Sequence, residues 1–561
     1  MKTGTASLSA RRRVLLGLGA LATAAAGGWL WTGRHRRPAA LAGTSAAPNA
    51  QAPASARRAE RFTQPLRIPA AAGLMADVVL RGELALTAGS ADFAIFPGAA
   101  TALWHYAGLH DGKAVANPLL RLQHGQKLQV NLHNALDEAT TAHWHGLSVD
   151  EANDGSGLHP VQPGAQRRYA FNVANRAGLY WYHAHPHGNT GKQIQRGLAG
   201  LLLVEDAQEN ALRARLGLNW GERDLPLLIA DKQIDSNNSI VYKDGADDWI
   251  GNRILVNWTA DAYLDAVPGL YRLRILNGCN ARLWRLAFVH RGGLLPFQLI
   301  GTDGGLLERP WRLQDIFLGP AQRIDVIVDF STVAVGDRVL LSSLDYMAME
   351  NEDDAGPLQP HLMADHPGAV PMGAAQDLME FRLVADRSQR RSFGAAAIPA
   401  RFQPLPPVAA EDCALRQFKL ALDAEGRWLI NQWNMYFNGH EPVFRVRRGS
   451  REIWEIHNAL ASMPHPIHVH GFQFRLLSRR ISPPDIRARA VTDTGLSPHD
   501  LGLLDTVVIW PGEIVRIAID FSQPFEGVQR YMLHCHNLEH EDRGMMITFA
   551  VDDDAKQLCE A

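Results

Sequence analysis

Short runs of alternating apolar and polar residues recur along most of the chain. Clear examples are residues 127–132 (Lys-Leu-Gln-Val-Asn-Leu), 323–328 and 514–519, and each begins within three residues of a glycine or proline. Successive side chains of a strand point to opposite faces, so this alternation predicts half-buried strands. Helical spacing is weak, and residues 208–216 are the best short candidate. The pattern predicts an all-β chain built from antiparallel sandwiches or barrels.

A weak internal repeat and one compositional break divide these strands into groups. A glycine turn before a strand that ends in asparagine occurs at residues 125–134 and again at 449–458. Residues 398–410 are rich in proline and alanine, so we predict a linker over 398–412. The three predicted β-domains, each of ordinary size, then span residues 57–210, 211–397 and 413–561.

The first 56 residues have the layout of an export signal. Three arginines at 11–13 precede a mildly apolar run over 14–31, and a polar stretch rich in alanine, proline and serine follows. Residues 12–16 (Arg-Arg-Val-Leu-Leu) resemble the twin-arginine signature. The alternative is an uncleaved membrane anchor. We expect a periplasmic protein, exported by the twin-arginine route, with no stable membrane insertion after removal of the signal.

Composition excludes several other classes of protein. The chain has 561 residues, of which 46% are hydrophobic, so it can form a substantial core. Lys and Arg total 56 against 58 Asp and Glu, which leaves no basic field for a nucleic-acid partner. Four cysteines are too few for a disulfide framework of this length. The 23 histidines are clustered, and this clustering is the informative feature.

Most of the candidate chemistry lies in four short histidine motifs. They occupy residues 143–146 (His-Trp-His-Gly), 181–185 (Trp-Tyr-His-Ala-His), 465–471 (His-Pro-Ile-His-Val-His-Gly) and 534–540 (His-Cys-His-Asn-Leu-Glu-His). Residues i and i+2 of a strand share one face. Four same-face pairs follow, and their eight imidazoles can converge on one cavity: His143 with His145, His183 with His185, His468 with His470, and His534 with His536.

A second and different environment is predicted around Cys535. Its side chain points to the opposite face of the strand from its two histidine neighbours. His465, an odd number of residues from His468, can lie on that side, and His540 and Met545 can fold back to join it. One thiolate, two imidazoles and a thioether form the ligand set of a blue-copper electron-transfer site. Imidazole alone also suits zinc, iron or nickel, so this set is what favours copper, and the eight imidazoles then match a multinuclear copper cluster.

The four motifs resemble the copper-binding signatures of the multicopper oxidases. Residues 276–282, 303–307 and 531–534 are further similar to the bacterial periplasmic copper-efflux oxidases and bacterial laccases. The resemblance implies three cupredoxin-like Greek-key domains, each a β-sandwich or barrel. It also implies four copper ions, of which one is type 1, one is type 2 and two are type 3.

The resemblance implies a role for each residue of the four motifs. The type 2 copper would be held by His143 and His468. The type 1 copper, where electrons enter one at a time, would be held by His465, Cys535, His540 and Met545. The type 3 pair, which with the type 2 copper reduces dioxygen to water, would be held by His145, His183, His185, His470, His534 and His536.

Reduction of dioxygen to water also consumes protons, so carboxylates are expected near the histidines. Glu541 directly follows His540, and the resemblance places an acidic proton donor there. Asp154 follows the first histidine motif and resembles the second acid of the family. The alternative for both is a solvated loop carboxylate.

Two features of the sequence bear on the reducing substrate. Met463 matches the copper-efflux oxidases, but Ala461 stands where that group has an aspartate. Residues 345–372 combine methionines, which suit Cu(I), with carboxylates, which favour the oxidised ion. The alternative for this segment is an acidic loop with incidental methionines. The candidate residues for substrate copper are Met463, Met347, Met349 and Asp353.

We therefore expect a monomeric oxidase of cuprous ion that acts in copper tolerance. The alternative reductant is a small phenol or aromatic amine, as for a laccase. Two non-enzyme alternatives are a copper-less cupredoxin scaffold of the cell envelope and a copper-storage protein. The scaffold predicts missing ligands, whereas all twelve positions are filled here. Storage explains the histidines but not the arrangement of Cys535 between two of them.

Overall fold

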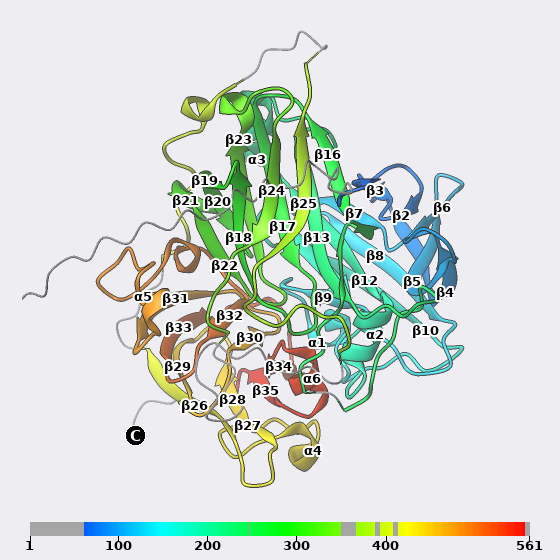
Figure 1. The fold of residues 1–561 in the computed structure, drawn as a ribbon. Coiled ribbons are helices and arrows are strands. Elements are labelled where there is room, and N and C mark those ends of the chain that lie inside the picture. Colours follow the sequence, from blue (N-terminus) through cyan, green and yellow to red (C-terminus); the bar gives the residue numbers. More distant parts are fainter. Residues whose placement is uncertain (1–60, 246, 349–365, 387–392, 408–412, 556–561) are drawn as a thin grey trace, which may run out of the picture. The chain divides into compact units, whose positions relative to one another are not determined.

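The computed structural model describes residues 61–245, 247–348, 366–386, 393–407 and 413–555, all within one compact unit. The predicted export signal (1–56), part of the predicted linker (408–412), Met349 and Asp353 lie outside the described residues. Six sheets account for the strands (Figure 1), which confirms the all-β prediction and groups them into three cupredoxin-like domains. No helix among the described residues is long and apolar enough to cross a membrane.

The first domain has a six-stranded sheet in the order β10-β8-β4-β5-β6-β2 and a five-stranded sheet in the order β3-β7-β12-β11-β9. In β8, Leu128, Val130 and Leu132 are buried in the core, as the alternation predicts. The strands are β2 (Gly73–Leu74), β3 (Asp77–Val79), β4 (Glu83–Phe93), β5 (Thr101–His110), β6 (Lys113–Ala116), β7 (Leu119–Gln123), β8 (Lys127–Asn134), β9 (His143–His145), β10 (Gln166–Asn172), β11 (Gly178–His183) and β12 (Ala199–Glu205).

The middle domain has two larger sheets, β15-β14-β13-β17-β23-β20-β21 and β1-β16-β25-β24-β18-β19, with β22 paired to β18. Its first strand, β1, lies in the part of the chain that we assigned to the first domain. The strands are β1 (Gln64–Pro65), β13 (Asp224–Lys232), β14 (Arg253–Val256), β15 (Thr259–Ala260), β16 (Ala262–Ala266), β17 (Leu270–Asn277), β18 (Trp284–His290), β19 (Gly293–Leu295), β20 (Phe297–Thr302), β21 (Gly305–Leu313), β22 (Asp315–Leu318), β23 (Arg323–Asp329), β24 (Arg338–Ser343) and β25 (Gln376–Leu383).

The C-terminal domain has two five-stranded sheets, β27-β26-β29-β33-β31 and β28-β35-β34-β30-β32. Its core contains Cys535, Met545 and Met463 among aromatic and aliphatic side chains. The strands are β26 (Ala414–Leu422), β27 (Trp428–Ile430), β28 (Phe444–Arg447), β29 (Arg451–Asn458), β30 (His465–Val469), β31 (Phe474–Arg480), β32 (Thr506–Ile509), β33 (Ile514–Asp520), β34 (Gln529–Cys535) and β35 (Met546–Asp552).

The sheets are mixed, although the sequence predicted antiparallel ones. Strands β4 and β8 are parallel, as are β26 and β29, while their other neighbours in these sheets are antiparallel. Alternation reports which face of a strand is buried but not the direction of its neighbour. The alternation of apolar and polar residues therefore cannot show where a crossover connection places a strand parallel to a non-consecutive neighbour.

Helices are few and short among the described residues. The longest is α3, where Asp206 accepts a hydrogen bond from the Glu209 N–H at the start and Gly217 adopts a left-handed φ of 64° at the end. It confirms the expectation for residues 208–216. The helices are α1 (Glu151–Asp154), α2 (Thr190–Arg196), α3 (Ala207–Leu216), α4 (Met435–Asn438), α5 (Pro484–Arg487) and α6 (Leu538–Asp542), with 3-10 turns η1 (Phe330–Thr332), η2 (Ala395–Ala397) and η3 (Pro498–Leu501).

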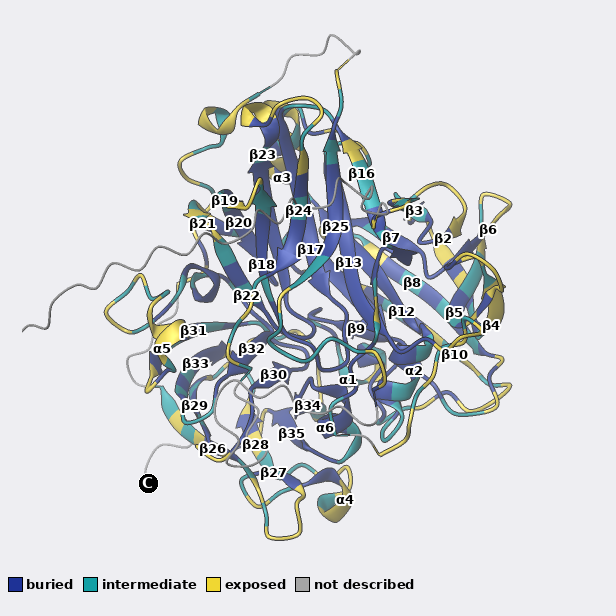
Figure 2. Cartoon of the chain, viewed as in Figure 1, coloured by how far each residue is buried: buried dark blue, intermediate teal, exposed yellow. Residues whose placement is uncertain are grey.

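Strand pairing brings the histidine motifs to one region. Strands β9 and β11 pair with His143 opposite His183, and β30 and β34 pair with His468 opposite His534. The first pair belongs to the first domain and the second pair to the C-terminal domain. Strands β9, β30 and β34 are coloured as buried in this region (Figure 2), and every residue of β11 is buried, so the histidines lie in the interior of the molecule.

Candidate metal centres

The eight histidines of the four i, i+2 pairs form one buried cluster. The rings of His143 and His470 stack with centroids 4.0 Å apart, and those of His145 and His468 stack at 3.8 Å. In both cases one ring comes from the first domain and the other from the C-terminal domain. His534 Nε2 lies 3.0 Å from His470 Nε2. All eight residues are at most 1% exposed.

Backbone carbonyls orient several of these rings. Nδ1 of His143 lies 2.8 Å from the Asp154 carbonyl, and Nδ1 of His468 lies 2.8 Å from the Asp505 carbonyl. An Nδ1–H that donates to a carbonyl leaves the Nε2 lone pair free for a metal. Nε2 of His143 and of His468, and both ring nitrogens of His536, are buried without a hydrogen-bond partner. Buried ring nitrogens without a protein partner fit bound metal ions.

Burial also sets the protonation of these groups. It lowers the pKa of His143, His145 and His468 well below the usual value, and the neighbouring imidazoles lower it further. Burial likewise lowers the pKa of His185 to about 4 and that of His536 to about 3. Neutral imidazole is the form that binds a metal, so these histidines are in the metal-binding protonation state at neutral pH.

A second group of ligand-type atoms lies on the other side of β34. Cys535 Sγ is 3.4 Å from His465 Nδ1 and 3.7 Å from His540 Nδ1, and the two Nδ1 atoms are 3.3 Å apart. The Met545 carbonyl accepts a hydrogen bond from the Cys535 N–H, which brings the methionine alongside. Burial raises the pKa of the Cys535 thiol. Binding of a metal ion deprotonates a coordinating thiol even where burial raises the thiol pKa. A buried Cys535 is therefore compatible with a role as a metal ligand.

The two groups adjoin through the backbone of residues 534–536. His534 and His536 belong to the eight-imidazole cluster, whereas Cys535 faces the two other histidines. This is the arrangement that strand alternation predicted. The structure thus brings eight histidines into one buried site and Cys535, His465 and His540 into a second, with Met545 beside it.

The two predicted carboxylates both lie against the cluster. Asp154 ends helix α1, with Oδ2 2.9 Å from His470 Nδ1, and burial raises its pKa to about 8. Glu541 lies in helix α6, 3.4 Å from His185 Nε2 and 3.2 Å from His534 Nδ1. Each is 1% exposed, so neither is a solvated loop residue.

Sequence reasoning missed a third carboxylate at the cluster. Asp505 Oδ1 lies 3.0 Å from His145 Nε2, and its other oxygen lies 2.5 Å from Nη2 of Arg323 in the middle domain. Asp303 accepts a hydrogen bond from the Arg323 N–H at 2.7 Å. The only signal in the sequence is an acid directly before the apolar run of β32, which is too weak to identify a site.

Sequence reasoning also missed the carboxylates and the aromatic ring beside His540. Its Nε2 lies 3.6 Å from Asp248 Oδ1 and 3.9 Å from Asp247 Oδ1, both from the middle domain. The Trp428 ring packs against His540 and His465, with centroids 4.5 and 4.8 Å away. These contacts join segments far apart in sequence, so no local sequence motif predicts them.

The candidates for substrate copper are not gathered in the same way. Met463 is 6% exposed and packs in the core that contains Cys535. Met347 is 46% exposed. Met349 and Asp353 lie outside the described residues, so their part in a copper-binding segment stays a prediction.

Comparison with known proteins supports the sequence-based resemblance. Residues 104–209 and 416–555 each match a family model described as multicopper oxidase. The structure of the McoA multicopper oxidase from Aquifex aeolicus is 33% identical, with a TM-score of 0.75, covering 87% of this chain and 99% of that one.

Two further relatives differ in what their names say about substrate. A laccase from Bacillus subtilis (strain 168) is 29% identical over 81% of this chain and 91% of its own. The structure of a Campylobacter jejuni multicopper oxidase, described as a metallo-oxidase, is 26% identical with a TM-score of 0.67, covering 88% of this chain and 96% of that one. With the paired histidine sites and this coverage, the chain belongs to the multicopper oxidase family, enzymes that use copper and dioxygen.

Proposed function

We propose that the two buried sites hold four copper ions, in the arrangement that the family resemblance implies. His465, Cys535, His540 and Met545 hold the type 1 ion. His143 and His468 hold the type 2 ion, while His145, His183, His185, His470, His534 and His536 hold the type 3 pair. The observation that carries this proposal is the separation of the atoms Cys535 Sγ, His465 Nδ1 and His540 Nδ1 by only 3.3–3.7 Å in a fully buried pocket. A thiolate with two imidazoles and a nearby thioether favours copper over other metals.

Copper bound in these sites would accept electrons singly from a reductant and deliver four of them to dioxygen. The chain contributes a fixed geometry to that reaction. Cys535 is covalently joined to His534 and His536, so the two sites are linked by a few bonds of one strand. Glu541 and Asp154 supply carboxyl groups within 3.4 Å of cluster histidines, where protons are needed.

The reductant is proposed to approach at the Nε2 edge of His540. The opposite histidine, His465, has its Nε2 3.0 Å from the hydroxyl of the buried residue Ser462, which closes that edge. His540 Nε2 lies 3.4 Å from Asn537 Nδ2, and beside it the Asp247 side chain is 40% exposed and that of Asp248 is 18% exposed. A reductant held by these carboxylates would lie next to a ligand of the thiolate site.

Cuprous ion is the proposed reductant. Asp247 is paired with Arg543, so the two carboxylates and this guanidinium keep one net negative charge, which favours a cation. Carboxylates bind Cu(II) better than Cu(I), which assists oxidation. A copper-oxidising role agrees with the relative described as a metallo-oxidase. A phenol is the second candidate, because Asp247 can accept the proton that a phenol loses on oxidation, and one relative is named a laccase.

Steady-state kinetics of variants at Asp247 and Asp248 test this proposal. Removing one charge in Asp247→Asn or Asp248→Asn is expected to raise the KM for cuprous ion about three- to fivefold, the effect of a partly screened charge. The KM for 2,6-dimethoxyphenol should change less. Asp244→Asn, an exposed acid of the same loop, is the matched control. An unchanged KM for both reductants would place the entry site elsewhere.

The cellular setting is also a proposal. The twin-arginine-like segment over residues 12–16 supports export to the periplasm, where a monomeric cuprous oxidase would contribute to copper tolerance. Replacing both arginines with lysine should leave the protein in the cytoplasm, as measured by fractionation. Periplasmic recovery of that variant would argue against this route.

A further inference from the structure

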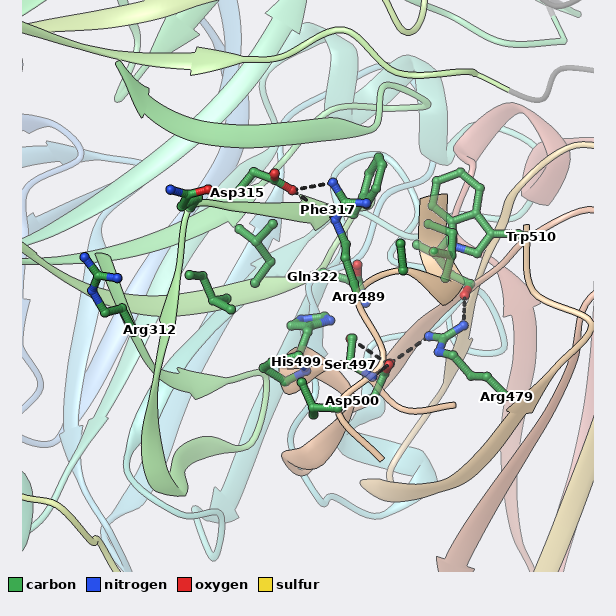
Figure 3. A pocket seen from close by; sticks show the side chains of 18 residues that line it. Arg312, Asp315, Phe317, Gln322, Arg479, Arg489, Ser497, His499, Asp500 and Trp510 are labelled. Carbon is green, nitrogen blue, oxygen red and sulfur yellow. Dashed lines mark hydrogen bonds and ion pairs between the residues drawn. The ribbon is translucent and has the colours of Figure 1, made fainter. Parts of the chain in front are cut away.

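The charged side chains that line a cavity of about 490 Å³, between the middle and C-terminal domains, include two ion pairs. Figure 3 shows Arg489 beside Asp315 and Arg479 beside Asp500, at 2.6 and 2.8 Å. The first pair joins the two domains, and the second lies within the C-terminal domain. These charges therefore serve contacts within the protein.

A pair of histidines lies outside this cavity and outside both buried sites. His187 follows β11 in the first domain, and His440 lies between α4 and β28 in the C-terminal domain. His187 Nδ1 is 3.0 Å from His440 Nε2, and the two rings are nearly perpendicular, at 89°. His440 is exposed and His187 is half-buried, so an ion in solution can reach the pair.

The separation of these two nitrogens fits a shared metal ion. Two imidazole nitrogens that each lie about 2.0 Å from one ion are about 2.8–3.3 Å apart when the angle at the metal is about 90–110°. In the thiolate site, Nδ1 of His465 and Nδ1 of His540 show the same spacing, at 3.3 Å. A hydrogen bond between two neutral rings has a similar length, and copper binding distinguishes the two arrangements.

Packing holds the His187 ring in place. A Cβ atom at residue 157, which is Gly157, would lie only 2.3 Å from His187 Cδ2, so glycine is needed beside this ring. His187 Nε2 is buried without a hydrogen-bond partner, which leaves Nδ1 as the nitrogen that meets His440 and the solvent. A ring positioned by packing loses little freedom when it binds an ion.

The charges beside His440 favour a cation. Burial lowers the pKa of His440, and the neighbouring Arg530 and His159 lower it further. Arg530 is paired with Glu151 at 2.5 Å, however, and the carboxylate of Glu441 also acts on it. Two carboxylates therefore face one guanidinium in this part of the surface.

We propose that His187 and His440 bind one Cu(II) ion at the surface, in addition to the ions of the buried sites. Two imidazoles in adjacent positions, with water in the others, suit Cu(II), and among divalent first-row ions Cu(II) binds a given nitrogen site most tightly. The rings of His187 and His185 lie 6.0 Å apart, so this ion is held one ring away from the eight-histidine cluster. Its two ligands belong to neither buried site, so the proposal does not depend on the four-copper assignment.

Equilibrium dialysis of the copper-loaded full-length enzyme against micromolar Cu(II) at pH 7.5 tests the proposal. The wild type should hold one more copper ion per chain than His440→Ala, a variant at an exposed position. Loss of one ligand should weaken binding of this ion at least as much as loss of an outer partner does, about 10- to 100-fold. The electron paramagnetic resonance spectrum of the wild type minus that of His440→Ala should show Cu(II) with nitrogen ligands. His457→Ala is the matched control, because this partly exposed histidine of the same domain contacts only Glu455, and it should keep the ion.

Three results would overturn the proposal. Equal copper content in the wild type and His440→Ala would show that the two rings only share a hydrogen bond. Equal loss in His440→Ala and His457→Ala would indicate adventitious copper on surface histidines. Loss of the ion in Asp247→Asn but not in His440→Ala would place it at the His540 edge. Absence of the blue Cys535 absorption would contradict the proposed function, but it would leave this comparison of copper contents unaffected.

Discussion

The carboxylate of Asp505 engages one ring nitrogen of His145 and leaves the other free. Asp505 Oδ1 lies 3.0 Å from His145 Nε2, while Nδ1 of the same ring faces His183 Nε2 at 3.4 Å. A histidine that donates one N–H to a carboxylate presents its second nitrogen to a metal. Because Asp505 also pairs with Arg323, one buried acid connects all three domains at the cluster.

Replacement of this acid should loosen the cluster. Asp505→Asn removes the charge that orients His145, and lost partners of this type typically lower metal affinity about 10- to 100-fold. Copper per chain, measured after dialysis against a chelator, should therefore fall below the wild-type content. Asp520→Asn, at an exposed ion pair of the same domain, is the control. Full copper retention by Asp505→Asn would show that Asp505 does not hold the ligand in place.

Glu541 should affect oxygen reduction rather than copper loading. Glu541→Gln keeps the shape of the side chain beside His185 and His534 but removes its ability to carry a proton. The blue absorption is expected to persist while turnover falls about 10²- to 10⁴-fold. Glu526→Gln, at an exposed acid, should behave like the wild type. Unchanged turnover in Glu541→Gln would remove this residue from the mechanism.

The copper-free protein should lose stability as the pH falls below about 6.5. The folded state lowers the histidine pKa values, so the unfolded chain binds more protons in this range and becomes favoured. Raised pKa values of buried acids such as Asp154 and Asp303 act in the opposite direction, but they are fewer. The nine lowered ligand histidines are His143, His145, His183, His185, His465, His468, His470, His536 and His540.

Urea unfolding of the copper-free protein at pH 7.5 and pH 5.5 measures this effect. The unfolding midpoint should be lower at pH 5.5. A midpoint that rises on acidification would mean that the buried acids dominate the proton balance.

Position 461 tests the choice of reductant. Ala461 is exposed and lies four residues before His465, where the copper-efflux oxidases have an aspartate. Ala461→Asp should increase cuprous turnover about two- to fivefold, because a carboxylate favours the oxidised ion. Ala461→Asn is the control, because asparagine has nearly the size of aspartate but no charge, and it should give no gain in cuprous turnover. No gain in Ala461→Asp would indicate that copper is delivered at another point, such as the Asp247 and Asp248 pair.

Local patterns were sufficient to predict the strands and the histidine sites. The alternation around Leu128 and Val130 identified a real strand face, and the i, i+2 spacing placed His534 and His536 opposite to Cys535. Both inferences depend only on the two-residue period of a strand. That period acts over neighbouring residues, which is why the sequence alone reveals it.

Contacts between distant segments could not be predicted in this way. Asp505 and Arg323 are 182 positions apart, and His540 lies 292 positions from Asp248. Neither acid belongs to a motif, and each gains its importance from the packing of the middle domain against its neighbours. The mixture of parallel and antiparallel strands could not be predicted for the same reason, since it depends on crossover connections rather than on local sequence pattern.

We propose that Cys535, His465 and His540 hold copper beside an oxygen-reducing cluster. The visible absorption spectrum of the copper-loaded protein and of Cys535→Ser tests this directly. The wild type should show an intense blue thiolate-to-copper band, and the variant should lack it while still binding copper at the histidine cluster. A colourless wild-type protein after full loading would contradict copper binding at this site, because Cys535 would then not bind Cu(II).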